Sequence, residues 1–297
     1  MRIAIRCLLG GILATSAAAV CAAGAAAQEQ GGEVLMPEQS AAKARAILLG
    51  AVDALGGNAY LTMHDVTCTG TFSNFGHSGE LNGFTKFQDF EIPPDKDRFE
   101  NVPKHNIIQI TSGDKGWTLD RGGVSEEAAT DLADNVEGRK TDLDNILRHR
   151  MNEKDMVLRY VGPDTVDRLE VDWVELTDPD NRIIRIAISK SSHLPIRKTV
   201  ETRNPNTQMK SEEVEYYSNF HPIQGIQTAY QITRDRNGLK VYQVFFDKCE
   251  YNTNLADSFF TKQALDERWE KVGKKSKYKS KSASKADKDD KDTNDKD

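Results

Sequence analysis

The chain has 297 residues, of which 38% are hydrophobic, 29% charged and 7% aromatic, and its 40 basic and 46 acidic side chains give a formal net charge of −6. This composition is typical of a soluble protein and excludes a multi-span membrane protein. Four cysteines are too few for a small scaffold held together by disulfides. The averages conceal three segments with different chemistry.

Residues 1–27 have the layout of a secretory signal peptide. Arg2 and Arg6 form a positive start, a small apolar run follows, and a small-x-small pattern ends at Ala27. We therefore expect cleavage after Ala27 and export to the periplasm. A lipid-modified Cys21 is a weaker alternative, because a valine precedes it where lipoprotein signals carry a small residue.

Residues 270–297 hold a lysine–serine block followed by an aspartate–lysine block. Such a segment cannot offset its ordering entropy by burial, so we expect a disordered tail. This segment can act as a basic arm that binds an anionic surface or only keep the protein soluble, and we favour the solubilising role. Its ten lysines and six aspartates leave −12 on residues 28–270 after signal removal. An acidic body with a basic tail binds nucleic acid poorly, so we expect no nucleic-acid partner.

Residues 28–269 form the predicted folded domain. A helix is expected over residues 38–56, where one face is apolar and two glycines follow. One or two further helices are expected within 125–150. Strands are expected wherever β-branched and aromatic residues alternate with polar ones, at 64–75, 79–91, 97–101, 105–112, 116–121, 155–161, 166–176, 182–189, 195–203, 209–219, 226–235 and 239–250.

Short turns join many of these predicted strands, with strong signals at Asp178-Pro-Asp-Asn181, Asn204-Pro-Asn206 and Arg236-Asn-Gly238. Strands joined in this way form an antiparallel meander, and a sheet of about eleven strands must curl. Its apolar face needs a cover. We therefore predict a monomer with a mainly β (α+β) fold: a strongly curved antiparallel sheet, or incomplete β-barrel, with helices covering the concave face.

Two cysteines remain after loss of the signal peptide, Cys68 and Cys249, each in a predicted strand. In an oxidising compartment they can form a disulfide, which would constrain the unfolded chain by about 5 kcal/mol. The alternative is two separate buried thiols, and the sequence leaves both open. Neither cysteine has the spacing of a zinc or redox site.

No catalytic constellation stands out. None of the six histidines has the spacing of a His-Glu-x-x-His motif, and no Gly-x-Ser-x-Gly elbow is present. Carboxylates are scattered on the predicted wet strand faces without a preferred acid/base pair. The aspartates of 287–297 lack the glycine and glutamate of a calcium loop. We therefore expect no enzyme, no cofactor and no metal.

Six short motifs follow one another along most of residues 38–262. They are Ala54-Leu-Gly-Gly57, Pro94-Asp-Lys-Asp-Arg-Phe-Glu100, Gly113-Asp-Lys-Gly-Trp117, Leu194-Pro-Ile-Arg197, Tyr216-Tyr-Ser-Asn-Phe-His-Pro-Ile-Gln-Gly-Ile226 and Asn252-Thr-Asn-Leu-Ala-Asp-Ser-Phe-Phe260. In this order they resemble the outer-membrane lipoprotein-sorting (LolA/LolB-like) superfamily. The sequence departs from it at Asp167-Arg168, where related chains often have Asp-Gly, and at Thr228-Ala229, where they often have proline.

The resemblance implies an incomplete antiparallel β-barrel with a helical lid over a hydrophobic cavity, and binding of acyl chains or lipidated proteins in the periplasm. A carrier of this kind removes CH₂ groups from water, worth about 0.8 kcal/mol each. We expect the lid within 125–150. The candidate cavity liners are Leu169, Val171, Trp173, Ile184, Ile186 and Ile188, with Trp117 and Phe245 in addition. For any single one of them, the role of an ordinary core residue under the helices is favoured over that of a liner.

Three functions remain. The first is a periplasmic carrier or binding protein for lipid or lipoprotein acyl chains, acting in outer-membrane lipoprotein sorting. The second is a ligand-sensing or protein-binding module of the same fold, with an envelope membrane protein as its partner. The third is a secreted hydrolase, which no motif supports.

Overall fold

The computed structural model describes residues 35–203 and 209–271. The predicted signal peptide, the turn at Asn204-Pro-Asn206 and nearly all of the predicted tail lie outside the described residues. Among the helices that are described, none has the length and apolar character needed to cross a membrane.

The first predicted helix is confirmed as α1, Pro37–Leu55. Proline at the first position suits a helix start, since its missing N–H would have no partner there. One face of α1 is buried, and two alanines and a serine on it let the helix lie close to the sheet. The buried residues are Ser40, Ala44, Leu48, Ala51, Val52 and Leu55. A second short helix that the sequence does not predict, α2 (Asn58–Thr62), follows after two glycines.

The strands form one antiparallel sheet of thirteen, one more than the twelve ranges expected to be strands. One of them, β6, falls at the edge of the range expected to be helical and pairs with β5. The strands are β1 (Val66–Phe75), β2 (Leu81–Ile92), β3 (Lys96–Val102), β4 (Ile108–Ser112), β5 (Lys115–Asp120), β6 (Gly123–Glu126), β7 (Val157–Val166), β8 (Leu169–Thr177), β9 (Ile183–Ser189), β10 (Pro195–Arg203), β11 (Lys210–Ile223), β12 (Ile226–Arg236) and β13 (Leu239–Tyr251).

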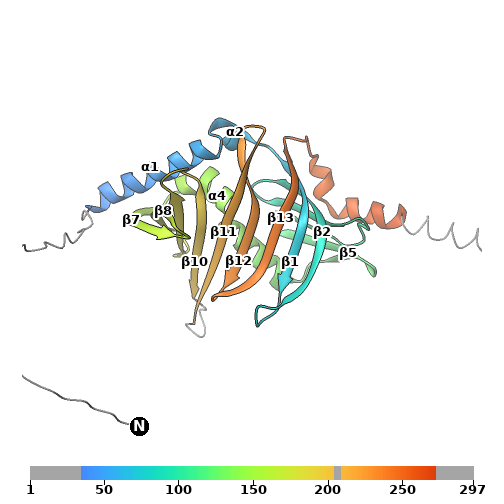
Figure 1. Cartoon of the computed structure of the whole chain (residues 1–297). Helices are drawn as coiled ribbons and strands as arrows, with labels where there is room; N and C mark the ends of the chain where they lie inside the picture. Colours follow the sequence, from blue (N-terminus) through green and yellow to red (C-terminus); the bar gives the residue numbers. More distant parts are fainter. Residues whose placement is uncertain (1–34, 204–208, 272–297) are drawn as a thin grey trace, which may run out of the picture. The chain divides into compact units, whose positions relative to one another are not determined.

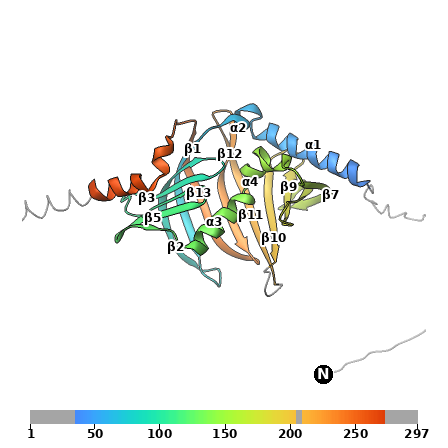
Figure 2. The same cartoon turned by 180° about the vertical axis from the view of Figure 1, so that it is seen from behind.

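The sheet is a meander in which the first strand also pairs with the last. Every neighbour in the sheet is a neighbour in the sequence except the β1–β13 pair (Figure 1). The two sheet edges, β6 and β7, do not pair with each other, and the chain between them forms α3 (Ala129–Lys140), α4 (Leu143–Arg148) and the turn η1 (Arg150–Asn152). Figure 2 shows α3 and α4 in front of the strands on the concave side. The predicted curved antiparallel sheet with helices on its concave face is therefore confirmed.

Three hairpins explain how the meander keeps its register. Both central residues of the β7–β8, β11–β12 and β12–β13 turns have positive φ, at Asp167-Arg168, Gln224-Gly225 and Asn237-Gly238. Two such residues in a row are typical of type I′ turns, whose twist matches that of the flanking strands. The Asp167-Arg168 pair therefore occupies a positive-φ turn although it lacks the glycine that such turns usually carry.

Two separate apolar clusters stabilise the two halves of the sheet. Strands β7–β13 pack against α1 and α4 through residues such as Leu48, Ile146 and Ile186, which are fully buried. On β2–β5 a second cluster includes Ile108 and Ile110, and the chain end covers it. That end comprises η2 (Asp257–Phe260) and a helix over 262–271, which the sequence does not predict.

A buried carboxylate holds this chain end in place. Asp65 is fully buried, and its two oxygens accept hydrogen bonds from the Thr253 hydroxyl and from three successive backbone N–H groups, those of Thr253, Asn254 and Leu255. Burial alone would raise the pKa of Asp65, but these bonds and one from His64 lower it. The motif Asn252–Phe260 therefore docks on the start of β1.

Candidate functional site

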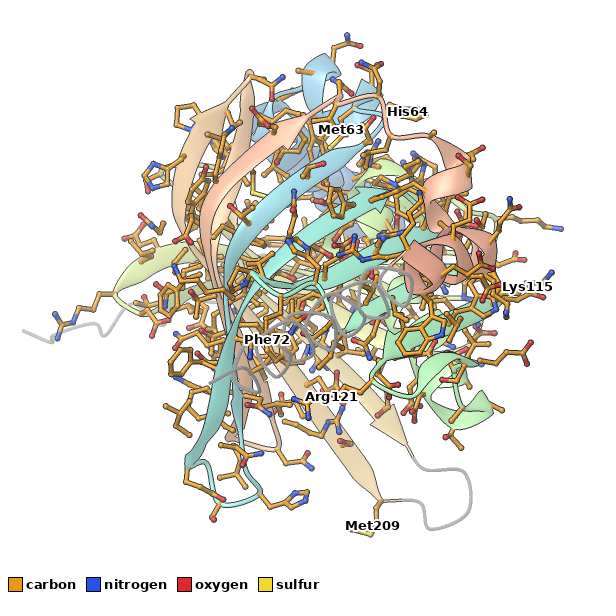
Figure 3. All side chains as sticks on the ribbon, turned by 90° about the vertical axis from the view of Figure 1, so that its right-hand side faces the viewer. Met63, His64, Phe72, Lys115, Arg121 and Met209 are labelled. Carbon is orange, nitrogen blue, oxygen red and sulfur yellow. A yellow bond between two sulfur atoms is a disulfide. The ribbon has the colours of Figure 1, made fainter. Side chains whose placement is uncertain are left out.

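A cavity of about 190 Å³ lies between the concave face of the sheet and the cover formed by α2 and α4. Met63, one of its lining residues, lies at the α2 end of the molecule, and Met209 marks the opposite end (Figure 3). The lining combines apolar, hydroxyl-bearing and acidic side chains from distant parts of the chain: Leu55, Tyr60, Met63, Val66, Cys68, Asp89, Glu91, Asp142, Leu143, Asp144, Pro195, Tyr217, Phe220, Ile226, Gln227, Thr228, Ala229, Ile232, Phe246 and Tyr251.

Two glycines bring the cover close to the sheet. A Cβ on Gly56 would lie 2.5 Å from the Gly225 carbonyl oxygen, and Gly56 has a φ of 136°, which disfavours other residues. The end of α1 can therefore rest on the β11–β12 turn. From there α2 places Tyr60 over the cavity, where its hydroxyl donates to Asp144 Oδ1 at 2.6 Å.

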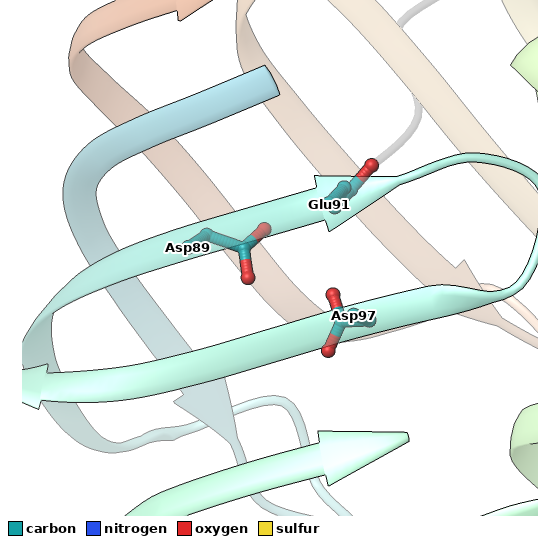
Figure 4. A group of neighbouring side chains, drawn as sticks. All are labelled: Asp89, Glu91 and Asp97. Atoms are coloured by element: carbon teal, nitrogen blue, oxygen red, sulfur yellow. The ribbon is translucent and has the colours of Figure 1, made fainter. Parts of the chain in front are cut away.

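Strand register gathers three carboxyl groups, of which Asp89 and Glu91 line the cavity and Asp97 lies behind them. Asp89 and Glu91 share one face of β2, and Glu91 lies directly opposite Asp97 of β3. Each of the three offers an oxygen within 4.8 Å of the others (Figure 4). Carboxylate oxygens are the ligands that hard cations use in proteins. Asp142, which caps α4, and Asp144 in its first turn bring two more carboxyl groups into the same lining.

Burial and mutual repulsion favour the protonated forms of these groups. Burial, followed by the charge of Asp97, raises the pKa of Glu91 to about 8. Burial raises the pKa of Asp97 to about 6, and burial together with Asp97 and Glu91 raises that of Asp89 well above its usual value. The Oδ1 atom of Asp89 is buried and has no hydrogen-bond donor. The wall therefore carries several carboxyl groups, and at least one of their oxygens has no hydrogen-bond donor.

Basic side chains near the cavity bind elsewhere. Arg139 of α3 donates to the carbonyl oxygens of Asp95 and Gly113, both at 2.7 Å. Lys198 of β10 donates to the Thr141 carbonyl oxygen at 2.6 Å and lies 2.6 Å from Glu215. These bonds attach the C-terminal end of α3, at Arg139 and Thr141, to both halves of the sheet. None of the residues that line the cavity is a lysine, arginine or histidine.

None of the eight candidate liners lies in the wall of this cavity. Ile184, Ile186 and Ile188 are buried in the core under α1, so the structure brings these three together. Trp117 belongs to the cluster beneath the chain end, and Phe245 is exposed. Their contact with acyl chains stays a prediction that this cavity does not support.

The remaining three candidates, Leu169, Val171 and Trp173, lie on the other face of the sheet from the isoleucines. Ile186 pairs with Val174 and Ile184 with Leu176, whereas Trp173 pairs with Ala187. Because paired residues share a face, Val174 and Leu176 are the β8 residues that face α1. Val171 and Trp173 pack in a small cluster with Val166 and Ala187, and Leu169 is exposed.

The two cysteines face each other across β1 and β13. Cys68 pairs with Cys249 in the register, and their sulfur atoms form a disulfide. Cys68 also lines the cavity. Of the two alternatives that the sequence leaves open, the structure has the bridge.

Sequence reasoning missed the acidic side chains of the wall. The available signal was the alternation Asp89-Phe-Glu91 within a strand, which is equally typical of a strand with its polar face in water. Asp97 lies inside one of the six motifs, Pro94–Glu100, but the sequence does not mark it as a site residue.

The architecture has counterparts among solved structures. A DUF1329 family protein from Desulfovibrio piger superimposes with a TM-score of 0.55 at 15% identity, covering 75% of this chain and 98% of that one. A putative outer membrane lipoprotein-sorting protein domain from Vibrio parahaemolyticus gives 0.51 at 12% identity, covering 76% and 99%. A LolA superfamily protein from Nitrosomonas europaea gives 0.50 at 13% identity, covering 75% and 99%.

These likenesses and the open thirteen-stranded meander define the class of protein: the chain has a LolA-like fold. The predicted resemblance to the lipoprotein-sorting superfamily is thereby confirmed at the level of the fold. The sequence itself matches no protein-family model and no curated protein sequence.

Proposed function

We propose that the chain is a carrier or binding protein of the periplasm that holds an acyl chain of a lipid or lipoprotein in the cavity. The observation that carries this proposal is the cavity itself, which lies between the concave face and its helical cover and has an apolar side built from Leu55, Val66, Ile226 and Ile232. Each CH₂ group buried there would contribute about 0.8 kcal/mol. Binding of this kind requires no catalytic group.

The cavity volume limits the size of the cargo. A water-sized group needs about 15 Å³ of such a cavity. A volume of 190 Å³ therefore accommodates on the order of ten groups of this size. That room suits one chain of about ten carbons, or one end of a longer chain. A larger cargo would require the cover to move.

The α3–α4 connection supplies a cover of suitable construction. None of the α3 residues is buried, whereas α4 buries Leu143, Ile146 and Leu147. Helix α3 is therefore held mainly by polar contacts such as those of Arg139. Such a helix can lift from the sheet without exposing a core, which is the behaviour expected of a lid.

A sensing module of the same fold is the second candidate. The half of the concave face under α1 is filled by side chains, and Ile184, Ile186 and Ile188 are at most 2% exposed. A largely filled concave face favours recognition of one small apolar group and a response passed to an envelope partner. Transport of a cargo with several acyl chains would need more room.

Displacement of a fluorescent probe tests the proposal. The uncharged fluorophore N-phenyl-1-naphthylamine should bind the full chain and be displaced by 1-decanol. Ala229→Phe places a ring in the cavity wall and should weaken probe binding at least tenfold. Ala42→Phe, at an exposed position on α1, is the matched control and should bind normally. Equal probe binding by both variants would contradict a binding role for this cavity.

A further inference from the structure

The carboxyl groups of the cavity wall have no basic side chain beside them in the lining. Carboxyl groups reach the lining from two separate places, with Asp89 and Glu91 on β2 and with Asp142 and Asp144 at the start of α4. Asp97 of β3 adds a fifth carboxyl behind them, within 4.8 Å of the first two. The lining has no basic side chain, so the protein itself supplies no counter-charge on this surface.

Neighbouring cations oppose the effect of burial only in part: the charge of Arg139 acts to lower the pKa of Asp97 and that of Lys198 the pKa of Asp142, but burial keeps both pKa values raised. Arg139 and Lys198 donate to backbone carbonyl oxygens, and Lys198 is also paired with Glu215. Arg148 of α4 donates to the Met63 carbonyl oxygen at 2.6 Å. The buried Oδ1 of Asp89 is left with no donor, and its closest acidic neighbours can donate only if they hold a proton. A ligand with donors and a positive charge would satisfy what the described residues leave unmet.

The acidic groups share one cavity with an apolar surface. Val66 lies beside Glu91 in the register of β1 and β2, and Cys68 lies beside Asp89. Phe220, Ile226 and Phe246 continue the apolar surface of the lining. A bare metal ion would bind the carboxylates and leave this apolar surface in contact with water. An amphiphile would bind the carboxylates with its head group and cover the apolar surface with its hydrocarbon chain.

We propose that the cavity takes an amphiphile with a cationic head: a primary ammonium group placed among Asp89, Glu91 and Asp97, and a hydrocarbon chain against the apolar surface. This inference rests on the proposed function and names its ligand class. Hydrogen bonds between an ammonium group and carboxylates are about twice as strong as neutral ones. A neutral or anionic head of the same chain length should therefore bind less well.

Binding should also release protons. The groups that face the head are Asp89 and Glu91 of β2, Asp97 of β3, Asp142 and Asp144 before and in α4, Tyr60 of α2, Tyr217 of β11 and Tyr251 of β13, with Arg139, Arg148 and Lys198 behind the wall. An ammonium group favours the ionised carboxylates, so it displaces the protons that they hold near neutral pH. An uncharged head displaces none.

Isothermal titration calorimetry of the full chain with three ten-carbon probes tests the inference. The probes are decylammonium, 1-decanol and decanoate, at pH 6.5 and below their aggregation concentrations. Decylammonium stays charged, since its pKa is close to that of lysine, about 10.4. We expect it to bind at least tenfold more tightly than decanol, and decanoate to bind most weakly. Titration in two buffers of different ionisation enthalpy should show release of about one proton for decylammonium alone.

Variants assign the preference to the wall. Glu91→Gln and Asp89→Asn should reduce the preference for decylammonium over decanol to less than threefold while decanol still binds. Glu91→Asp keeps the charge and should retain most of the preference. Glu170→Gln, at an exposed position of β8, is the matched control and should leave it unchanged. Retained binding of decanol shows that each variant is folded.

The outcomes separate this inference from the proposed function. Similar affinities for the three probes would overturn the cationic head and leave the acyl-binding cavity in place. Binding of none of them would overturn both. Tight binding of Ca²⁺ or Mn²⁺ alone, abolished by Glu91→Gln and without a preference for decylammonium, would assign the carboxyl groups to a metal ion and also overturn the inference.

Discussion

Glu91 is a carboxyl group whose surroundings favour the protonated form, and this has a consequence for stability. Its pKa is raised to about 8 in the folded chain, against 4.5 for an ordinary glutamate. Between these values the folded state holds a proton that the unfolded state has lost. Stability therefore falls as the pH rises from about 4.5 to about 8, and each unit of pKa difference corresponds to about 1.4 kcal/mol.

Glu91→Gln should consequently stabilise the protein at pH 8 by about 2 to 4 kcal/mol and have little effect at pH 4.5. The glutamine amide is neutral at every pH, so the cost of a buried carboxylate disappears. Urea unfolding followed by circular dichroism at the two pH values measures the difference. Glu170→Gln serves as the exposed control. A variant that loses stability at pH 8 would show that Glu91 is ionised and well paired.

Lys198 illustrates the opposite case, a buried charge with a partner. Its side chain is 3% exposed and lies 2.6 Å from Glu215, which also pairs with Arg234 and accepts a hydrogen bond from Tyr217. Burial alone would raise the pKa of Glu215, but Lys198 and Arg234 hold it well below its usual value. The resulting stabilisation is fully present above the unfolded pKa and is lost only as the pH falls through the folded one.

Lys198→Met should destabilise the protein by about 3 kcal/mol at pH 7, because Glu215 loses one of its two cations and the Thr141 carbonyl oxygen loses its donor. Lys210→Met removes an exposed lysine that lies 3.9 Å from Glu201 and should change stability by less than about 0.5 kcal/mol. Chemical unfolding at pH 7 compares the two. Equal effects of both substitutions would argue against a structural role for the buried pair.

At the scale of whole elements, local pattern predicted most of the strands and α1. Alternation of apolar and polar residues indicates a strand, and the turn residues indicate the hairpins. Alternation does not indicate which face of the strand is covered when both faces carry apolar residues. Strand β8 has Val171 and Trp173 on one face and Val174 and Leu176 on the other, so only its pairing with β9 shows which face lies under α1.

The acidic wall could not be predicted for a related reason. In β2 the polar residues Asp89 and Glu91 alternate with Phe90 and Ile92, which by itself indicates that the polar face is in water. The apolar face of this strand is instead covered by Phe259 and Phe260, from a segment about 170 residues later in the chain. No local signal reports such a cover. The polar residues consequently line the concave side.

The disulfide joins β1 and β13, the first and last strands along the chain, which are neighbours in the middle of the sheet, so it should contribute to the coupling of the two halves of the sheet. Its cysteines are 181 residues apart, and the entropic model gives about 5 kcal/mol for closing so long a loop. Replacing both with serine should destabilise the chain by about 3 to 5 kcal/mol, measured by urea unfolding without reductant. Wild-type protein in reductant is the matched comparison. A loss below about 1 kcal/mol would show that β1 and β13 pair as firmly without the bridge.

At the scale of the whole molecule, one sheet provides two different concave surfaces. The half formed by β7–β9 is filled by side chains under α1, whereas β2 and β3 present carboxyl groups. The cavity lies where these halves meet, closed by α2 and the α3–α4 connection. This LolA-like fold thereby offers a small pocket with an apolar side and an acidic side, and this division accounts for both the proposed cargo and its proposed head group.

Native mass spectrometry of the full chain, expressed with its predicted signal peptide and purified from the periplasm, tests the central claim most directly. The account predicts one releasable lipid-sized ligand per chain, absent from Ala229→Phe and present in Ala42→Phe. A chain that carries no ligand, with all three proteins at the mass of the polypeptide alone, would contradict the binding of an acyl chain in this cavity.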